Sequence, residues 1–174
     1  MLKRVRQVPA KLKAPFLGVR PPHSPRPPLS SLLTRTESIT PIFLVSDLMG
    51  QSVLIGSFGA SAVLLFGAHE SPRAQPRNLV GGHLISALVA VLIFATVGVS
   101  SFSIALAVGV AICAMNLTHT THPPGGATAL IGVQSGANWL FVVVPVLAGV
   151  VILLTLALLT NNFVYHRRYP NHWV

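Results

Sequence analysis

One stretch of this sequence concentrates side chains that can bind or protonate a small ligand. Residues 119–131 read HTTHPPGGATALI, and long apolar segments precede and follow them. Imidazole can donate, accept or carry a proton near neutral pH, and glycine lets a ligand approach the backbone closely. A helix that begins at the Pro-Pro pair would point free amide hydrogens and its positive dipole end toward an anion. The pattern therefore predicts an anion-binding site around residues 122–128.

The predicted anion ligands are groups that donate hydrogen bonds or carry positive charge. We expect backbone amides of the Gly-Gly pair and nearby hydroxyl groups to replace part of the anion's hydration. An imidazole would supply charge or a proton, and an arginine before a long apolar segment would attract anions. The predicted set is Ser57, Ser61, Arg77, His122, Gly125, Gly126 and Thr128.

Each of these residues also has a structural interpretation. The serines and glycines could serve helix packing through small residues. The histidines could lie in an interfacial loop that ends at the prolines, and the arginine could be a solvated loop charge. His83 and Asn116 are other uncharged polar residues deep in apolar segments, and each could bond a neighbouring helix.

The remaining polar residues do not indicate a catalytic or metal site. Asp47 and Glu70 are not placed as a carboxylate pair, and His119 and His122 have no carboxylate or thiol near them in sequence to complete a metal site. Phosphate-loop and dinucleotide fingerprints are absent. The single Cys113 can form neither an internal disulfide nor a thiolate metal cage. We therefore expect a protein that is not an enzyme and that uses no metal and no cofactor.

The composition places these residues in a membrane protein. Of 174 residues, 52% are apolar and only 9% are charged, whereas soluble domains average about 25% charged residues. Lysine and arginine cluster before residue 36, which the positive-inside rule assigns to the cytoplasm. We interpret residues 1–31 as a disordered, basic, Pro-rich cytoplasmic tail, with a transit peptide as the alternative, and expect no nucleic-acid partner. Residues 32–165 would form the transmembrane domain and residues 166–174 a C-terminal tail.

The apolar segments predict an all-α, multi-pass transmembrane helix bundle. Residues 79–99 and 139–160 each reach the roughly 20 residues that cross a bilayer core. Residues 102–117 are shorter but uniformly apolar, and residues 32–49 form an imperfect span with charges near its ends. We expect these four segments to cross, with both termini in the cytoplasm. In a five-span alternative, residues 51–68 also cross and the C-terminus lies outside.

A short motif recurs and suggests an internal two-fold repeat. Residues 59–64 (GASAVL) match residues 126–131 (GATALI) at an offset of 67. The second copy leaves too few residues to cross alone, so we expect a re-entrant half-helix that begins at the prolines, and the first copy could form another. Transporters are often built from such repeats, with the substrate site formed by interrupted helices at the repeat interface.

Three motifs resemble the HPP family of integral membrane proteins. They are GSFGASAVLLFGA at 56–68, SPRAQPRNLVGGHLISAL at 71–88 and THPPGGATALIGV at 121–133. The family is named for the triplet matched by His122, Pro123 and Pro124. The closing segment also fits, with Asn161, Asn162, Arg168, Tyr169 and Pro170. The resemblance implies four transmembrane helices and, because plant chloroplast and cyanobacterial members are linked to it, nitrite transport.

The sequence and this resemblance together favour a transporter of a small monovalent anion, with nitrite as the leading substrate. The alternative is a membrane scaffold or assembly protein of the same family that transports nothing. We expect the lipid bilayer and a small inorganic anion as partners, and a homo-oligomer, because four spans enclose little volume. The expected location is a bacterial or cyanobacterial cell membrane, with the chloroplast envelope as the alternative.

Overall fold

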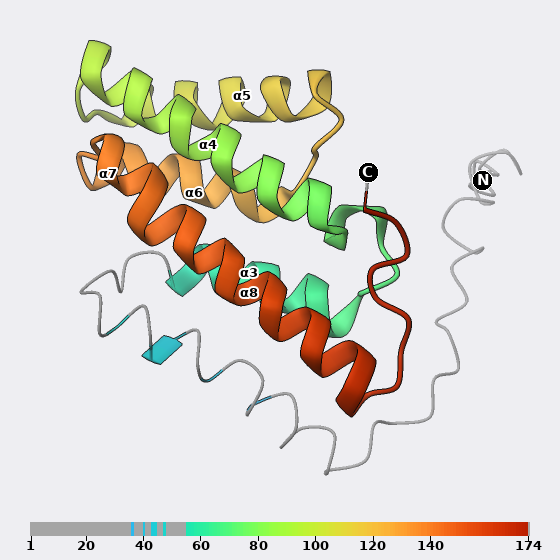
Figure 1. Cartoon of the computed structure of the whole chain (residues 1–174). Coiled ribbons are helices and arrows are strands. Elements are labelled where there is room, and N and C mark those ends of the chain that lie inside the picture. The colour runs from blue at the N-terminus through green and yellow to red at the C-terminus, as the bar shows by residue number, and fades with distance from the viewer. Residues whose placement is uncertain (1–35, 37–39, 41–42, 45–46, 48–54, 174) are drawn as a thin grey trace, which may run out of the picture. The chain divides into compact units, whose positions relative to one another are not determined.

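The regular elements of the described chain are all helices. The computed structural model describes residues 36, 40, 43, 44, 47 and 55–173 (Figure 1). Within these residues the structure contains no strand, which confirms the all-α prediction. Of the predicted span 32–49, only Thr36, Thr40, Phe43, Leu44 and Asp47 are described, and each has helical conformation. The rest of that span and the predicted tail 1–31 lie outside the described residues.

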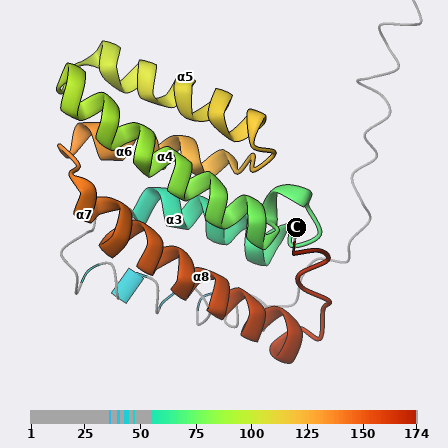
Figure 2. The ribbon, with the colours of Figure 1, turned by 45° about the horizontal axis from the view of Figure 1, so that its top comes forward.

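Two successive helices form a hairpin. Helix α4 (Pro76–Val97) begins at a proline, whose missing amide hydrogen costs nothing in a first turn. It ends at Gly98, which has φ of 74°. Helix α5 (Ser101–Leu117) starts with a capping box between Ser100 and Ser103. The two helices lie side by side in both views (Figures 1 and 2).

The C-terminal helix is longer than the predicted segment 139–160. It comprises α7 (Trp139–Phe141), η4 (Val142–Leu147), α8 (Ala148–Leu159) and η5 (Thr160–Val164). The π-helical turn η4 contains Pro145, which lacks the amide hydrogen that a regular α-helix needs. Within the described residues, this helix and α4 are long and apolar enough to cross a membrane. Helix α5, with 17 residues, is shorter.

The two copies of the repeated motif lie in short helices. The first copy is in α3 (Ile55–Ala62) and the π-helical turn η2 (Val63–Gly67), and the second is in α6 (Pro123–Gln134). Helix α6 begins at the first proline, as predicted, because the ring fixes a helical φ. Its 12 residues extend about 18 Å, well short of a bilayer core of about 30 Å.

Apolar side chains fill two clusters on either side of α4. One joins α3 and η2 to α4 and α8, and it includes Phe58, Leu65, Phe66, Leu79 and Leu153. The other joins α4, α5 and α6. Its buried members are Val89, Ala90, Ala107, Ala111, Met115, Ala129 and Val133. Helix α6 thus contacts both α4 and α5, and α3 contacts α6 from the other side.

The residues after the last helix fold back onto the loop before α4. Tyr169 Oη donates to the Ala74 carbonyl oxygen at 2.8 Å, and the Asn171 amide donates to Gln75 Oε1 at 2.9 Å. Burial raises the pKa of the Tyr169 phenol, so the hydroxyl keeps its proton and remains a donor. This contact fixes the loop that includes the 3₁₀ turn η3 (Pro72–Ala74).

Candidate functional site

Five buried polar side chains form one hydrogen-bonded series, which we call the polar chain: Ser57, Ser61, His83, His122 and Thr128. Each of them is 0% exposed. Ser61 Oγ lies 2.9 Å from His122 Nε2 and 2.8 Å from His83 Nε2. Thr128 Oγ1 lies 2.7 Å from His83 Nδ1 and 2.6 Å from Ser57 Oγ. The structure therefore brings together four of the seven predicted ligands, and His83 connects them.

Helices α3, α4 and α6 hold the polar chain between them. Ser57 and Ser61 stand four residues apart in α3, so they share one face of that helix. His83 projects from α4 and Thr128 from α6. Ser57 Oγ also lies 3.0 Å from the Pro124 carbonyl oxygen, which ties α3 to the first turn of α6. Because a buried polar group without a partner costs free energy, these side chains stabilise the packing only when they meet.

His122 precedes α6 and is held by the loop before α4. Its φ of −127° and ψ of 103° are the extended values that a following proline favours. Its Nδ1 lies 2.8 Å from the carbonyl oxygen of Arg73. A carbonyl oxygen only accepts hydrogen bonds, so Nδ1 of His122 must carry a hydrogen. The ring centroids of His122 and His83 are 4.9 Å apart.

His83 is the site residue that the sequence-based set omits. The sequence predicted only that it would bond a neighbouring helix, because it is a polar residue deep in an apolar segment. In the structure its two ring nitrogens contact Ser61 and Thr128. These two hydroxyl residues occupy aligned positions in the repeated motif, 67 residues apart. A search for a polar residue between the two copies could have found it.

The start of α6 does not present the free amides that the sequence predicted. Pro123 and Pro124 have no amide hydrogen, and the amide of Gly125 donates to the His122 carbonyl oxygen at 2.8 Å. In a regular helix the amide of Gly126 donates to that same carbonyl. The series of hydroxyl and imidazole groups, rather than the backbone, therefore offers the exchangeable hydrogens here.

The two glycines of α6 differ in their surroundings. A Cβ atom on Gly125 would lie 2.8 Å from the Gly82 carbonyl oxygen and 2.9 Å from Ser86 Oγ. Gly125 therefore allows α6 to pack against α4, and α4 fills the space where a ligand would have approached. A Cβ atom on Gly126 would meet its nearest neighbour, Val108, at 3.9 Å, which is an ordinary van der Waals contact, so this position has room for a side chain.

The predicted cation lies apart from the polar chain. Arg77 is exposed, and its Nη2 donates to the Thr118 carbonyl oxygen at 3.1 Å. Arg73 instead lines a groove together with Thr121 and Pro123, the two neighbours of His122. Its backbone carbonyl also orients His122, so Arg73 is closer to the predicted site than Arg77 is.

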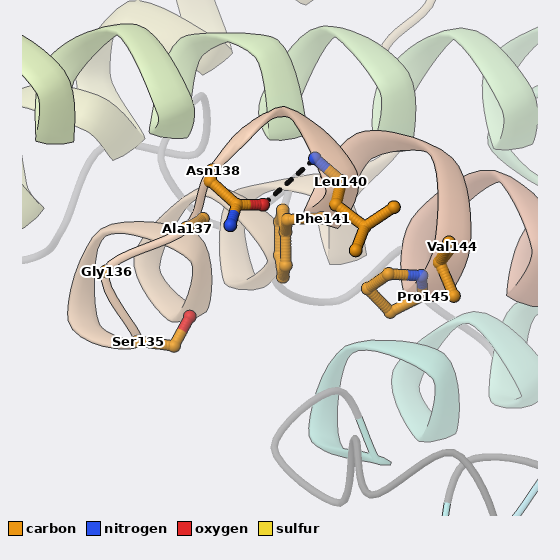
Figure 3. Close-up of a pocket in the computed structure, with 8 residues that line it drawn as sticks. All are labelled: Ser135, Gly136, Ala137, Asn138, Leu140, Phe141, Val144 and Pro145. Carbon is orange, nitrogen blue, oxygen red and sulfur yellow. Dashed lines mark hydrogen bonds between the residues drawn. The ribbon is translucent and has the colours of Figure 1, made fainter.

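A groove beside α6 and a pocket at the turn after it open on the described surface, and no residue of the polar chain lines either of them. The groove beside α6 has a volume of about 530 Å³, and Gly126 is the predicted ligand that lines it. Its other lining residues are mostly apolar: Val108, Ile112, Met115, Ala127 and Leu130. A second pocket of about 240 Å³ lies at the turn from α6 to α7, where Asn138 accepts a hydrogen bond from the Leu140 amide (Figure 3). Among the described residues, no three His, Cys, Asp or Glu side chains are grouped as metal ligands.

Comparison with known proteins identifies relatives of this chain. Residues 20–170 match the family description "HPP, transmembrane region". A transmembrane protein of Dictyostelium discoideum is 47% identical over 129 residues, which cover 70% of this chain and 45% of the relative. Another from the same organism is 48% identical over 128 residues, 69% of this chain and 41% of the relative. The chain thus spans less than half the length of these curated relatives, and no solved structure matches it. Because the family match extends over most of the chain, the protein belongs to the HPP family of transmembrane proteins.

Proposed function

We propose that this membrane protein transports a small monovalent anion, with nitrite as the first candidate. The observation that carries the proposal is the polar chain itself. Its five hydroxyl and imidazole side chains are fully buried among apolar helices, where polar groups are costly and commonly mark a pathway. The resemblance to family members that are linked to nitrite transport supplies the candidate substrate.

The proposed topology has four spans and two re-entrant half-helices. The helical segment 55–67 contains 13 residues and extends about 20 Å, which is too short to cross a bilayer core of about 30 Å. Helix α6 is shorter still. Contacts of α3 with α6, at positions that the repeat aligns, support a two-fold repeat with the site at the repeat interface.

The anion would bind to hydroxyl and imidazole hydrogens after α3 and α6 separate. In the structure Ser57 contacts both Thr128 and the Pro124 carbonyl oxygen, so the hydroxyl groups of the two half-helices are bonded to each other. A small outward movement of α3 would release these hydrogens for an anion, as rocking of one repeat against the other does in transporters. The structure would then represent the closed state. The groove beside α6, which Arg73 lines, is the proposed approach.

The second candidate function is a membrane scaffold that transports nothing. The observation in its favour is that each member of the polar chain already has a hydrogen-bond partner within the fold. Such a network can specify how helices pack without binding any ligand. The scaffold predicts a stable, folded protein that allows no anion flux.

Flux through purified protein in liposomes distinguishes the two functions. We would compare nitrite, nitrate, formate and chloride, with protein-free liposomes as the measure of passive leak. Transport predicts nitrite flux above leak, and strong loss of it in His122→Ala. Gly126→Leu would slow entry by filling the groove, because the groove offers space for the side chain. Ser135→Ala, at an exposed hydroxyl in the turn after α6, is the control that keeps wild-type flux. Folded wild-type protein without flux, or full flux in both site variants, would reject the proposal.

A further inference from the structure

The contact between His122 and the Arg73 carbonyl oxygen determines the hydrogen positions in the polar chain. Nδ1 of His122 carries a hydrogen because it faces a carbonyl oxygen. In a neutral imidazole the other nitrogen is then an acceptor, so the Ser61 hydroxyl donates to His122 Nε2. Because a serine hydroxyl has only one hydrogen, Ser61 must accept the bond from His83 Nε2.

The same reasoning orders the remainder of the chain. Neutral His83 then carries its hydrogen on Nε2 and accepts at Nδ1 from the Thr128 hydroxyl. Thr128 in turn accepts from Ser57. With both imidazoles neutral, every hydrogen of the series therefore points toward the Arg73 carbonyl oxygen. The two histidines must be in opposite tautomers, with the hydrogen on Nδ1 in His122 and on Nε2 in His83.

The chain also contains two carbonyl oxygens that accept hydroxyl hydrogens when a proton is added. Ser61 Oγ lies 3.2 Å from the Ser57 carbonyl oxygen. If His122 gains a proton on Nε2, the Ser61 hydrogen turns to that oxygen and Ser61 accepts from both rings. If His83 gains a proton on Nδ1, Thr128 donates to Ser57 and Ser57 donates to the Pro124 carbonyl oxygen at 3.0 Å. Either protonated state is fully hydrogen-bonded without a change in heavy-atom positions.

We propose that the polar chain is a proton-binding site that takes one proton from water and shares it between His83 and His122 through the Ser61 hydroxyl. The donor is a hydronium ion, which becomes water, and release reverses the step. When His83 passes its Nε2 proton to Ser61, Ser61 passes its own hydrogen to His122 Nε2. The positive charge then moves from one ring to the other. Two charged rings with centroids 4.9 Å apart would repel each other strongly, so the site holds one added proton.

Among the described residues, the groups that face the two rings provide no fixed counter-charge for this proton. From α3 the rings meet the Ser61 hydroxyl and the Phe58 ring, whose centroid is 5.5 Å from that of His83. From α6 they meet Thr128. Met115 of α5 lies beside Gly82 and the His122 side chain. The described carboxylates, Asp47 and Glu70, are exposed, and so is the Arg73 side chain.

This site deepens the proposed transport function, because a proton that travels with a monovalent anion cancels its charge. A buried anion and a buried proton each cost less when they are bound together than when either is bound alone. The inference rests on the proposed function only for this coupling. The proton site itself rests on the hydrogen-bond geometry and can be tested without transport.

Nitrogen NMR of the histidine rings tests the proton site directly. We would label histidine with ¹⁵N in full-length protein in lipid nanodiscs and assign the signals with His83→Gln and His122→Gln. At neutral pH we expect opposite tautomers, with the hydrogen on Nδ1 in His122 and on Nε2 in His83. On acidification both rings should shift over one shared pH range, because they share one proton. Matching tautomers, or rings that titrate independently in the wild type, would overturn the inference.

Two serine variants separate a shared proton from mere packing. Ser61→Ala removes the connecting hydroxyl but not the repulsion between the rings, so the proton should stay on one ring and the two rings should no longer shift over one shared pH range. Ser86→Ala removes a different buried hydroxyl, on α4, which makes a weak contact with the Met115 sulfur at 3.9 Å, so it should keep the shared titration. Coupled titration that survives in Ser61→Ala would overturn the role of Ser61.

Proteoliposomes with a pH-sensitive dye test the coupling to transport. We expect nitrite uptake to carry protons inward beyond the leak measured without protein, and Ser61→Ala to lose this proton movement while Ser86→Ala keeps it. Nitrite flux without proton movement would reject the coupling but leave the proposed function in place. Shared ring titration without any anion flux would reject the transport function while the proton site stands.

Discussion

Ser61 is the residue on which the polar chain depends most, because both imidazoles contact its hydroxyl. Ser61→Ala leaves two buried ring nitrogens without this partner. A buried unsatisfied group costs about 1–3 kcal/mol, so we expect a loss of stability of that order in a denaturant or thermal unfolding assay in detergent. Ser135→Ala, at an exposed hydroxyl, is the control and should leave the unfolding midpoint unchanged. Equal midpoints for the two variants would contradict the prediction.

The adjacent glycines of α6 give a matched pair of substitutions. Gly125→Ala would place a Cβ atom within 2.8 Å of the Gly82 carbonyl oxygen, so we expect destabilisation. Overpacking of this kind typically costs about 1–3 kcal/mol. Gly126→Ala meets its nearest neighbour at 3.9 Å, and there alanine favours the helix, so the change should be neutral or slightly stabilising. The unfolding midpoints of the two variants decide; a larger loss at Gly126 would show that the packing is wrong.

Individual residues also show how far the sequence could predict this site. Ser57, Ser61, His122 and Thr128 were all predicted as ligands of one cavity, from residue type and from the repeated motif. His83 was missed because periodicity does not reveal which face of an apolar helix meets another segment. The free amides predicted at Gly125 failed for a local reason, since His122 supplies the carbonyl that accepts the amide hydrogen.

Among the helices, boundaries set by proline and glycine were predictable, and tertiary contacts were not. The start of α6 at Pro123 and the end of α4 before Gly98 follow from local chemistry. The C-terminal helix continues past the predicted residue 160 as the π-helical turn η5, where the Asn161 and Asn162 side-chain amides donate to the Ala157 and Leu158 carbonyl oxygens. Nothing in the local sequence indicated that the segment after it would return to the loop before α4.

That returning segment leads to a prediction about the loop that orients His122. Tyr169→Phe removes the hydroxyl that donates to the Ala74 carbonyl oxygen, next to the Arg73 carbonyl. We expect about 1 kcal/mol of lost stability and a shift of the His122 ring signal in the labelled protein. Tyr165→Phe is the matched control, because the Tyr165 hydroxyl has no hydrogen-bond partner among the described residues. An unchanged His122 signal in Tyr169→Phe would show that the segment does not act on this loop.

Considered over its full length, the chain is predicted to place both termini on the same side of the membrane. Four crossings require this arrangement, whereas the five-span alternative separates the termini. The short helical segments 55–67 and 123–134 favour four crossings. Small tags at each end, probed for antibody access in sealed vesicles, would measure the arrangement. Access to one tag but not the other would support five spans. Lysed vesicles, in which antibody reaches both tags, give the control.

The position of His83 between Ser61 and Thr128 has a consequence for how this chain can evolve. One imidazole, from a helix that belongs to neither copy of the motif, satisfies a hydroxyl of each. Duplicated segments usually diverge freely once their roles separate. Here, a substitution that removes one of the two hydroxyls changes which tautomer of His83 can hydrogen-bond to the other. The Ser61 and Thr128 positions are therefore expected to change together or not at all.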